Sequence, residues 1–236
     1  MTRYYKSDSI SQLNSTHGYI LMNEEIARVL LEKKAVTLNA KVPFTFVSGI
    51  RSPIYCDNRQ MIAYPEERKQ IVDAFINESR DGDFDIVAGT STAGIPWASW
   101  ISDKLNKPMA YIRGAKKEHG AGNQIEGADV DGKKVLIVED LISTGGSSFR
   151  AVEAVREGGG NCETVVAIFS YDFEKANKIF KEGDCKLLVI TNFSTLVNVA
   201  SKNGFLTDSE QALVLSWNKD PQNWGPKHGF PNADKG

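Results

Sequence analysis

The feature that most constrains the fold of this chain is residues 135–148, where an apolar run meets two acids and a loop of small residues. The run Val135–Val138 is rich in β-branched side chains and predicts a strand buried on both faces. Glu139 and Asp140 follow at the expected end of this strand, and a Ser-Thr-Gly-Gly-Ser loop then leads into a helical pattern. Free backbone N–H groups and the helix dipole both favour an anion at such a helix N-terminus. The stretch therefore predicts a phosphate site with two carboxylates beside it.

Two common phosphate-binding motifs are missing from this loop. It has neither the G-x-x-x-x-G-K-[ST] of nucleoside-triphosphate P-loops nor the dinucleotide fingerprint G-x-G-x-x-G. Carboxylates next to a phosphate repel it unless they face groups that need acceptors, such as ribose hydroxyls or a hydrated magnesium ion. An ordinary strand-to-helix turn with an acidic flank is the less favoured explanation.

Residues 139–147 resemble the phosphoribosyl-diphosphate signature of the type I phosphoribosyltransferases, which has the same order of strand, two acids, two apolar residues and Thr/Ser/Gly turn. The resemblance implies that the two acids hold the ribose hydroxyls and that the turn binds the 5′-phosphate. The residues it assigns to this ligand are Glu139, Asp140, Leu141, Ile142, Ser143, Thr144, Gly145, Gly146 and Ser147.

A second anion-binding turn is predicted at residues 90–94. The apolar run 85–89 reads as a strand, and the small residues after it precede a helical pattern near 95–105. Such a turn is common in α/β proteins, but two in one sheet are more persuasive. In the family the corresponding turn contacts the pyrophosphate, which implies that Thr90 and Thr92 lie there.

Residues 44–59 predict two short strands around a turn at Ser48-Gly49, with a break at Ser52-Pro53. On these residues alone the segment is a β-hairpin with exposed polar ends and a purely structural role. The segment is similar to the N-terminal hood of one branch of the family, the orotate phosphoribosyltransferases, because it holds every fixed letter of F-x-x-x-S-G-x-x-S-P-x-Y-x-D-x-R. The resemblance implies that Tyr55, Arg59 and Ser143 contact orotate.

The loop at residues 113–124 is basic, rich in glycine and almost without core residues, so it is expected to be mobile. Alone, it is typical of a solvated surface loop. It also matches the R-x-x-x-K-x-H-G of the same branch at Arg113, Lys117, His119 and Gly120. The resemblance implies a catalytic lid whose cations Arg113, Lys117 and His119 neutralise the leaving pyrophosphate, and a homodimer in which each lid reaches the neighbouring site.

Strands alternate with helices along the chain, which predicts an α/β fold with a parallel sheet covered on both sides. The resemblance implies the type I phosphoribosyltransferase fold: a mostly parallel central sheet flanked by helices, with a small N-terminal hood. We expect a polar extension at 1–22 and a domain at 23–218, with the hood at about 23–60 and the core at about 66–218. The proline-containing tail, 219–236, is expected to be irregular.

Composition limits the partners and the compartment. The 236 residues are 41% hydrophobic and 25% charged with a formal charge of −2, so no basic field for nucleic acid is expected. No apolar run approaches the length that spans a bilayer, and three scattered cysteines favour a reducing cytoplasm. The resemblance implies orotate and 5-phosphoribosyl 1-diphosphate as substrates and magnesium as cofactor, with no direct metal ligand because the substrate holds the ion.

Three positions depart from a frequent pattern of the orotate branch. Val47 and Gly114 stand where many members have lysines, and Phe173 stands where many have an arginine. Backbone N–H groups, Arg51 or Arg59 could then meet the orotate carboxylate. A transferase for another base and a non-catalytic sensor of phosphoribosyl diphosphate remain alternatives, although the first should lack this hood and the second typically loses its lid cations and gains a DNA-binding segment.

Overall fold

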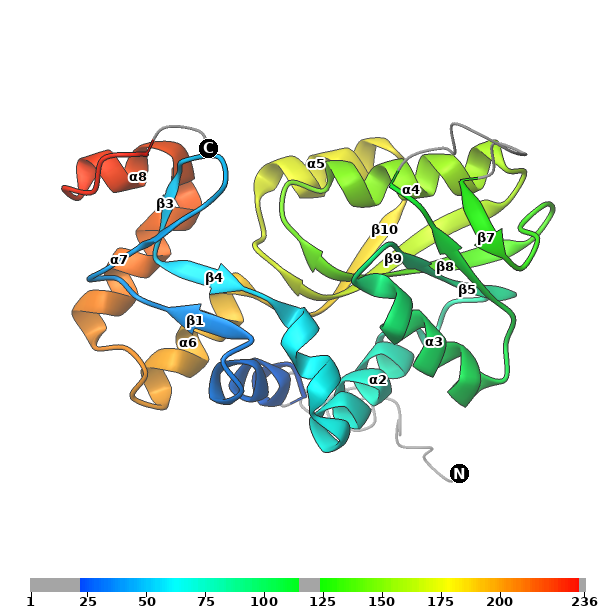
Figure 1. The fold of residues 1–236 in the computed structure, drawn as a ribbon, viewed down its shortest axis with the longest axis horizontal. Coiled ribbons are helices and arrows are strands. Elements are labelled where there is room, and N and C mark those ends of the chain that lie inside the picture. Colours follow the sequence, from blue (N-terminus) through cyan, green and yellow to red (C-terminus); the bar gives the residue numbers. More distant parts are fainter. Residues whose placement is uncertain (1–21, 115–123, 234–236) are drawn as a thin grey trace, which may run out of the picture.

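The computed structural model describes residues 22–114 and 124–233 and is built around a six-stranded sheet (Figure 1). The strand order is β10-β9-β8-β5-β6-β7, and every neighbouring pair is parallel except β6 and β7. The strands are β5 (Ile86–Thr90), β6 (Met109–Ile112), β7 (Ile125–Gly127), β8 (Lys134–Ile142), β9 (Asn161–Ser170) and β10 (Lys186–Asn192). The mostly parallel central sheet is confirmed.

Helices cover both faces of this sheet because its strands are apolar on both sides. Along β8, Leu136 and Val138 enter one buried cluster whereas Val135 and Ile137 enter another, as the alternation of a strand requires. Figure 1 shows one pair of helices below the sheet and another pair above it. The lower pair is α2 (Pro65–Ser79) and α3 (Gly94–Leu105), and the upper pair is α4 (Gly146–Glu157) and α5 (Glu174–Glu182).

A second group of elements, here called the hood lobe, lies beside the sheet (Figure 1). Its N-terminal part holds a helix over residues 22–32, the antiparallel pair β1 (Val36–Leu38) and β4 (Ile54–Cys56), and the hairpin β2 (Phe44–Thr45) and β3 (Arg51–Ser52). The hairpin is the one expected from the sequence. The 3-10 helix η1 (Asn58–Ala63) leads from the hood lobe to α2.

The far end of the chain completes the hood lobe with α6 (Phe193–Lys202), α7 (Asp208–Lys219) and α8 (Pro221–Lys227). The expectation of an irregular tail was wrong for α8. Its first residue is a proline, which suits a helix start because that position needs no N–H donor. Trp224 then buries its ring and donates from Nε1 to the Leu213 carbonyl oxygen at 3.1 Å, which fixes α8 against α7.

The expected end of the central strand was also wrong. β8 does not stop before the acidic pair but runs on to Ile142, because β9 pairs with it as far as Leu141↔Phe169 and Ile142↔Ser170. Glu139 and Asp140 are therefore strand residues with fixed directions. Within residues 22–114 and 124–233, the structure contains no helix that is both long and apolar enough to cross a membrane.

Candidate active site

The phosphate loop is short, because only residues 143–145 separate β8 from α4. Gly145 ends it at a φ of +79°, and a Cβ there would lie 3.1 Å from the Cα of Ala176 on α5. Glycine satisfies both the left-handed conformation and the close approach. With no side-chain cap at this residue, the first N–H groups of α4 face outward at the positive end of the helix. The turn thus has the geometry that the predicted anion site requires.

The two carboxylates before the loop are held differently. Glu139 is only 9% exposed, and its carboxylate accepts hydrogen bonds from the Ser148 hydroxyl and the Asp140 backbone N–H, both at 3.0 Å. Burial, with the charge and hydrogen bonding of Glu139, raises the pKa of Asp140 to about 7. Asn58 of η1 donates to the Asp140 carbonyl oxygen at 2.7 Å and so ties the hood lobe to the acidic pair.

The turn at residues 90–94 lies directly beside β8. The Thr90 hydroxyl donates to the Val138 carbonyl oxygen at 3.4 Å, and a Cβ on Gly94 would lie 2.4 Å from that same oxygen. Glycine is required here because the helix N-terminus touches the neighbouring strand backbone. The turn at 90–94 and the first turns of α4 border one hollow of about 280 Å³ at the carboxyl ends of the strands, whereas the loop residues 143–145 are not among those that line it. Residues from the sequence prediction that line it are Thr90, Thr92, Arg113, Glu139, Asp140, Leu141 and Ser147.

Arg113 and Gln124, the first and last residues of the expected lid loop, line the edge of this hollow. The Arg113 backbone N–H donates to the Gln124 carbonyl oxygen at 2.9 Å, and the Gln124 amide donates to the Arg113 carbonyl oxygen at 3.0 Å. These bonds close the two ends of the loop, and the Arg113 guanidinium is 3.9 Å from Glu126. Lys117 and His119 lie outside the described residues, so their predicted roles remain predictions.

The predicted base contacts come from the hood lobe and the phosphate loop. Tyr55 is exposed on β4 and packs against the Phe44 ring at 5.6 Å between centroids. Arg59 donates from Nε to Asp57 at 2.6 Å, and its positive charge lowers the pKa of Asp140, although less than burial raises it. Ser143 is exposed in the phosphate loop. Tyr55, Arg59 and Ser143 are not among the residues that line the 280 Å³ hollow.

Sequence reasoning missed Asn58 and Arg150. Arg150 lines the hollow from α4, four residues after Gly146, and its Nη1 lies 3.8 Å from the Cβ position of that glycine. The i, i+4 spacing on a helix could have placed it above the phosphate loop. Asn58 gave no such signal, because its contact with Asp140 spans 82 positions of the sequence.

The positions that depart from the orotate branch have different surroundings. Val47 is 90% exposed at the tip of the hood hairpin. Phe173 packs as part of an aromatic group, stacked on Tyr171 at 5.6 Å and close to Trp217. Arg51, a candidate for the orotate carboxylate, donates instead to Pro231 and Thr45. Arg59 is also paired, with Asp57, but its charge interacts with Tyr55 and Asp140, so it is the arginine nearer the acidic pair.

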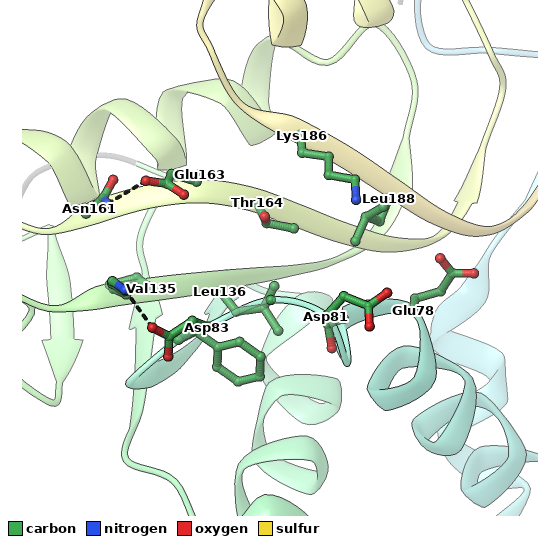
Figure 2. Close-up of a pocket in the computed structure, with 14 residues that line it drawn as sticks. Glu78, Asp81, Asp83, Val135, Leu136, Asn161, Glu163, Thr164, Lys186 and Leu188 are labelled. Carbon is green, nitrogen blue, oxygen red and sulfur yellow. Dashed lines mark hydrogen bonds and ion pairs between the residues drawn. The ribbon is translucent and has the colours of Figure 1, made fainter. Parts of the chain in front are cut away.

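Figure 2 shows a second hollow, of about 270 Å³, at the opposite edge of the sheet. It is lined by the amino ends of β8, β9 and β10 and by the turn after α2. Two of its acidic side chains have partners within the hollow: Asp83 pairs with Lys134 at 2.6 Å, and Glu163 accepts from Asn161 at 2.8 Å. Ligands of parallel α/β sheets bind at the carboxyl ends of the strands, so the first hollow is the candidate site.

Comparison with known proteins agrees with this geometry. Residues 62–198 match the phosphoribosyl transferase domain. The orotate phosphoribosyltransferase of Listeria innocua is 46% identical over 206 residues, covering 86% of this chain and 99% of its own length. That of Coxiella burnetii is 49% identical over 204 residues, covering 86% and 98%. The crystal structure of the Aeropyrum pernix orotate phosphoribosyltransferase shares the fold, with a TM-score of 0.64 and 23% identity over 77% of this chain and 99% of that one. The chain belongs to the phosphoribosyltransferase family, and within it to the orotate phosphoribosyltransferases.

Proposed function

We propose that this chain transfers ribose 5-phosphate from 5-phosphoribosyl 1-diphosphate to orotate, giving orotidine 5′-phosphate and pyrophosphate in pyrimidine biosynthesis. One observation carries the proposal. A carboxylate pair faces a hollow between the turn at 90–94 and the N-terminal part of α4, and a hood with the orotate-type sequence is tied to that pair through Asn58 and Asp140. The ribose hydroxyls need acceptors between two phosphate sites, which is what this order of groups provides.

The reaction replaces pyrophosphate by the base nitrogen at the anomeric carbon, through a transition state that resembles an oxocarbenium ion. No protein nucleophile is needed, so catalysis rests on positioning and on charge stabilisation of the leaving group. The N-terminus of α4 and residues Ser143–Ser147 seat the 5′-phosphate, while Glu139 and Asp140 orient the ribose. Thr90 and Thr92 meet the pyrophosphate beside Arg113, and Lys117 and His119 add charge when the lid closes.

Magnesium fits the chemistry of this hollow. Substrate phosphates and water would supply most of the ligands of the ion, and the nearby carboxylates of Glu139 and Asp140, which face the ribose, favour a cation beside them. When bound, the ion screens the diphosphate and aids its departure.

The proposed reaction is tested by a transfer assay that follows orotidine 5′-phosphate and pyrophosphate together. We expect equal amounts of both, and loss of both when a chelator removes magnesium. Pyrophosphate release without the nucleotide would overturn the proposed reaction.

Arg59 is proposed to bind the orotate carboxylate, because Arg51 is engaged elsewhere and Arg59 is near Asp140 and Tyr55. Hydrogen bonds to charged groups contribute about 1.5–3 kcal/mol, so Arg59→Gln should raise the KM for orotate about 10- to 100-fold. The KM for phosphoribosyl diphosphate should change little. Arg80→Gln is the matched control, since Arg80 is an exposed arginine that lies 3.8 Å from Asp81 on the surface. An unchanged orotate KM in Arg59→Gln would contradict this role.

The raised pKa of Asp140 predicts a pH dependence of substrate capture. Below a pH of about 7 this carboxyl is protonated in the free protein, which weakens it as an acceptor for ribose hydroxyls. We therefore expect kcat/KM for phosphoribosyl diphosphate to rise as the pH increases to about 7. The Asp140→Asn variant should lose this rise, whereas His119→Asn should keep it. A rise that persists in Asp140→Asn would show that another group titrates.

Asp140 should also make the stability of the ligand-free chain depend on pH, in the direction opposite to its effect on substrate capture. Its pKa is higher in the folded chain, about 7, than the ordinary 3.8, so the folded state binds more protons between these values. The contribution of Asp140 to the free energy of unfolding is therefore greatest at low pH and decreases as the pH rises to about 7. The melting temperature of the ligand-free chain, measured relative to Asp140→Asn, should fall over this range.

A further inference from the structure

The last part of the described chain, residues 221–233, covers the hood hairpin and is here called the C-terminal clamp. Its anchor is Trp224, which is 2% exposed and stacks on Phe230 with ring centroids 6.0 Å apart. Trp224 also donates from Nε1 to the Ser216 hydroxyl at 3.0 Å. The clamp is thus a packed element, fixed to α7 from one side.

From its other side the clamp holds Arg51 of the hairpin. Arg51 donates from Nε to the Pro231 carbonyl oxygen at 2.9 Å and from its backbone N–H to the Asn232 side chain at 3.4 Å. The Ala233 N–H donates to the Gly49 carbonyl oxygen at 3.0 Å. Gly225 lies so close that a Cβ there would be 2.7 Å from the Cβ of Arg51. Both strand and turn of the hairpin are therefore hydrogen bonded to the clamp.

Contacts within the hairpin connect Arg51 to Tyr55 on β4. Its Nη1 donates to the Thr45 hydroxyl across the hairpin at 2.5 Å, and the next pair in register is Phe44↔Ser52. The Phe44 ring in turn packs on Tyr55. The buried Ser52 hydroxyl donates to the Ile54 carbonyl oxygen at 2.8 Å, which shapes the start of β4.

We propose that the C-terminal clamp is a positioning element for the base: it fixes the hairpin through Arg51 and thereby orients Tyr55 for orotate. This inference rests on the proposed function and adds a part of the chain far from both phosphate-binding turns. Those turns are built on β5 and β8 and on the starts of α3 and α4. Loss of the clamp contacts should therefore weaken orotate binding and leave the binding of phosphoribosyl diphosphate intact.

The test compares two shortened chains. A chain that ends at Phe230 keeps the stack on Trp224 but loses Pro231, Asn232 and Ala233, whereas a control that ends at Ala233 keeps all of them. We expect the shorter chain to show an orotate KM raised about tenfold, with kcat and the KM for phosphoribosyl diphosphate within about twofold of the control. Equal orotate KM values in the two chains, or equal increases in both KM values, would overturn the inference.

A point variant keeps the test decisive if the shorter chain does not fold. Asn232→Ala in the full chain removes the acceptor for the Arg51 N–H and the donor to the Gln222 carbonyl oxygen. It should raise the orotate KM about threefold without changing the KM for phosphoribosyl diphosphate. No selective change would count against the clamp. Activity of the full chain with orotate tests the proposed function separately, so the two failures are distinguishable.

Discussion

The Lys117→Ala variant is expected to lose about two to three orders of magnitude in kcat, because removal of one preorganised charge from a developing anion has effects of this size. The pyrophosphate carries away negative charge as the glycosidic bond breaks, and the lid is proposed to supply the cations that stabilise it. The sequence around Lys117 holds almost no core residues, so the melting temperature should stay within about 1 °C. Steady-state kinetics and thermal denaturation of the same preparation check both parts.

Lys116→Ala is the matched control, since it removes the same charge one residue earlier in the same loop. Lys116→Ala should keep kcat within a few-fold of the parent chain. Equal losses of kcat in the two variants would mean that the loop acts through its overall positive charge and not through Lys117 in particular.

Sharing of the lid in a homodimer can be tested by mixing Lys117→Ala with Asp140→Asn. A shared lid gives each mixed dimer one intact site, so about a quarter of the wild-type activity should return. No recovery after demonstrated subunit exchange would place lid and acids in the same subunit.

Gly94→Val is expected to destabilise the chain more than any of the other proposed substitutions. Its Cβ would lie 2.4 Å from the Val138 carbonyl oxygen and 2.6 Å from the Thr90 hydroxyl, and the first of these atoms belongs to the central strand. Overpacking a core typically costs about 1–3 kcal/mol, which corresponds to a melting temperature lower by about 3–10 °C in a chain of this size. The turn at 90–94 must also move away from β8, so the KM for phosphoribosyl diphosphate should rise.

Gly114→Ala is the control for this prediction. Gly114 also lines the hollow, but a Cβ on it would meet nothing within 4 Å. We expect the melting temperature of Gly114→Ala to match the parent chain. If Gly94→Val were equally stable, the close contact between the turn at 90–94 and β8 would not exist in solution.

The sequence was sufficient for the parallel strands of the sheet but not for β7, the short antiparallel strand at its edge. Buried parallel strands are continuous apolar runs, so β5, β6 and β8 were recognisable, and the turns after β5 and β8 mark the predicted anion sites. Each of these signals is local in the chain. The residues they predicted, such as Thr90, Glu139 and Ser147, do line one hollow.

The parts that could not be predicted depend on contacts between distant segments. β8 extends past the acids because β9 pairs with it there, and the tail forms α8 because Trp224 finds a partner on α7. Its charge alone made Arg51 a candidate to bind orotate. Its guanidinium instead donates a hydrogen bond to the carbonyl oxygen of Pro231, 180 positions later in the sequence. Neither composition nor spacing reports such pairings. They are also the contacts on which the C-terminal clamp depends.

Base selectivity would decide whether this chain is an orotate-specific transferase. Initial rates with phosphoribosyl diphosphate and magnesium would be compared for orotate, uracil, adenine and hypoxanthine. We expect turnover of orotate alone, with uracil rejected because it lacks the carboxylate that Arg59 is proposed to bind. Turnover of another base would retain the fold and the mechanism but contradict the assignment of the hood. Tight binding of phosphoribosyl diphosphate without turnover of any base would contradict the catalytic account and indicate a sensor.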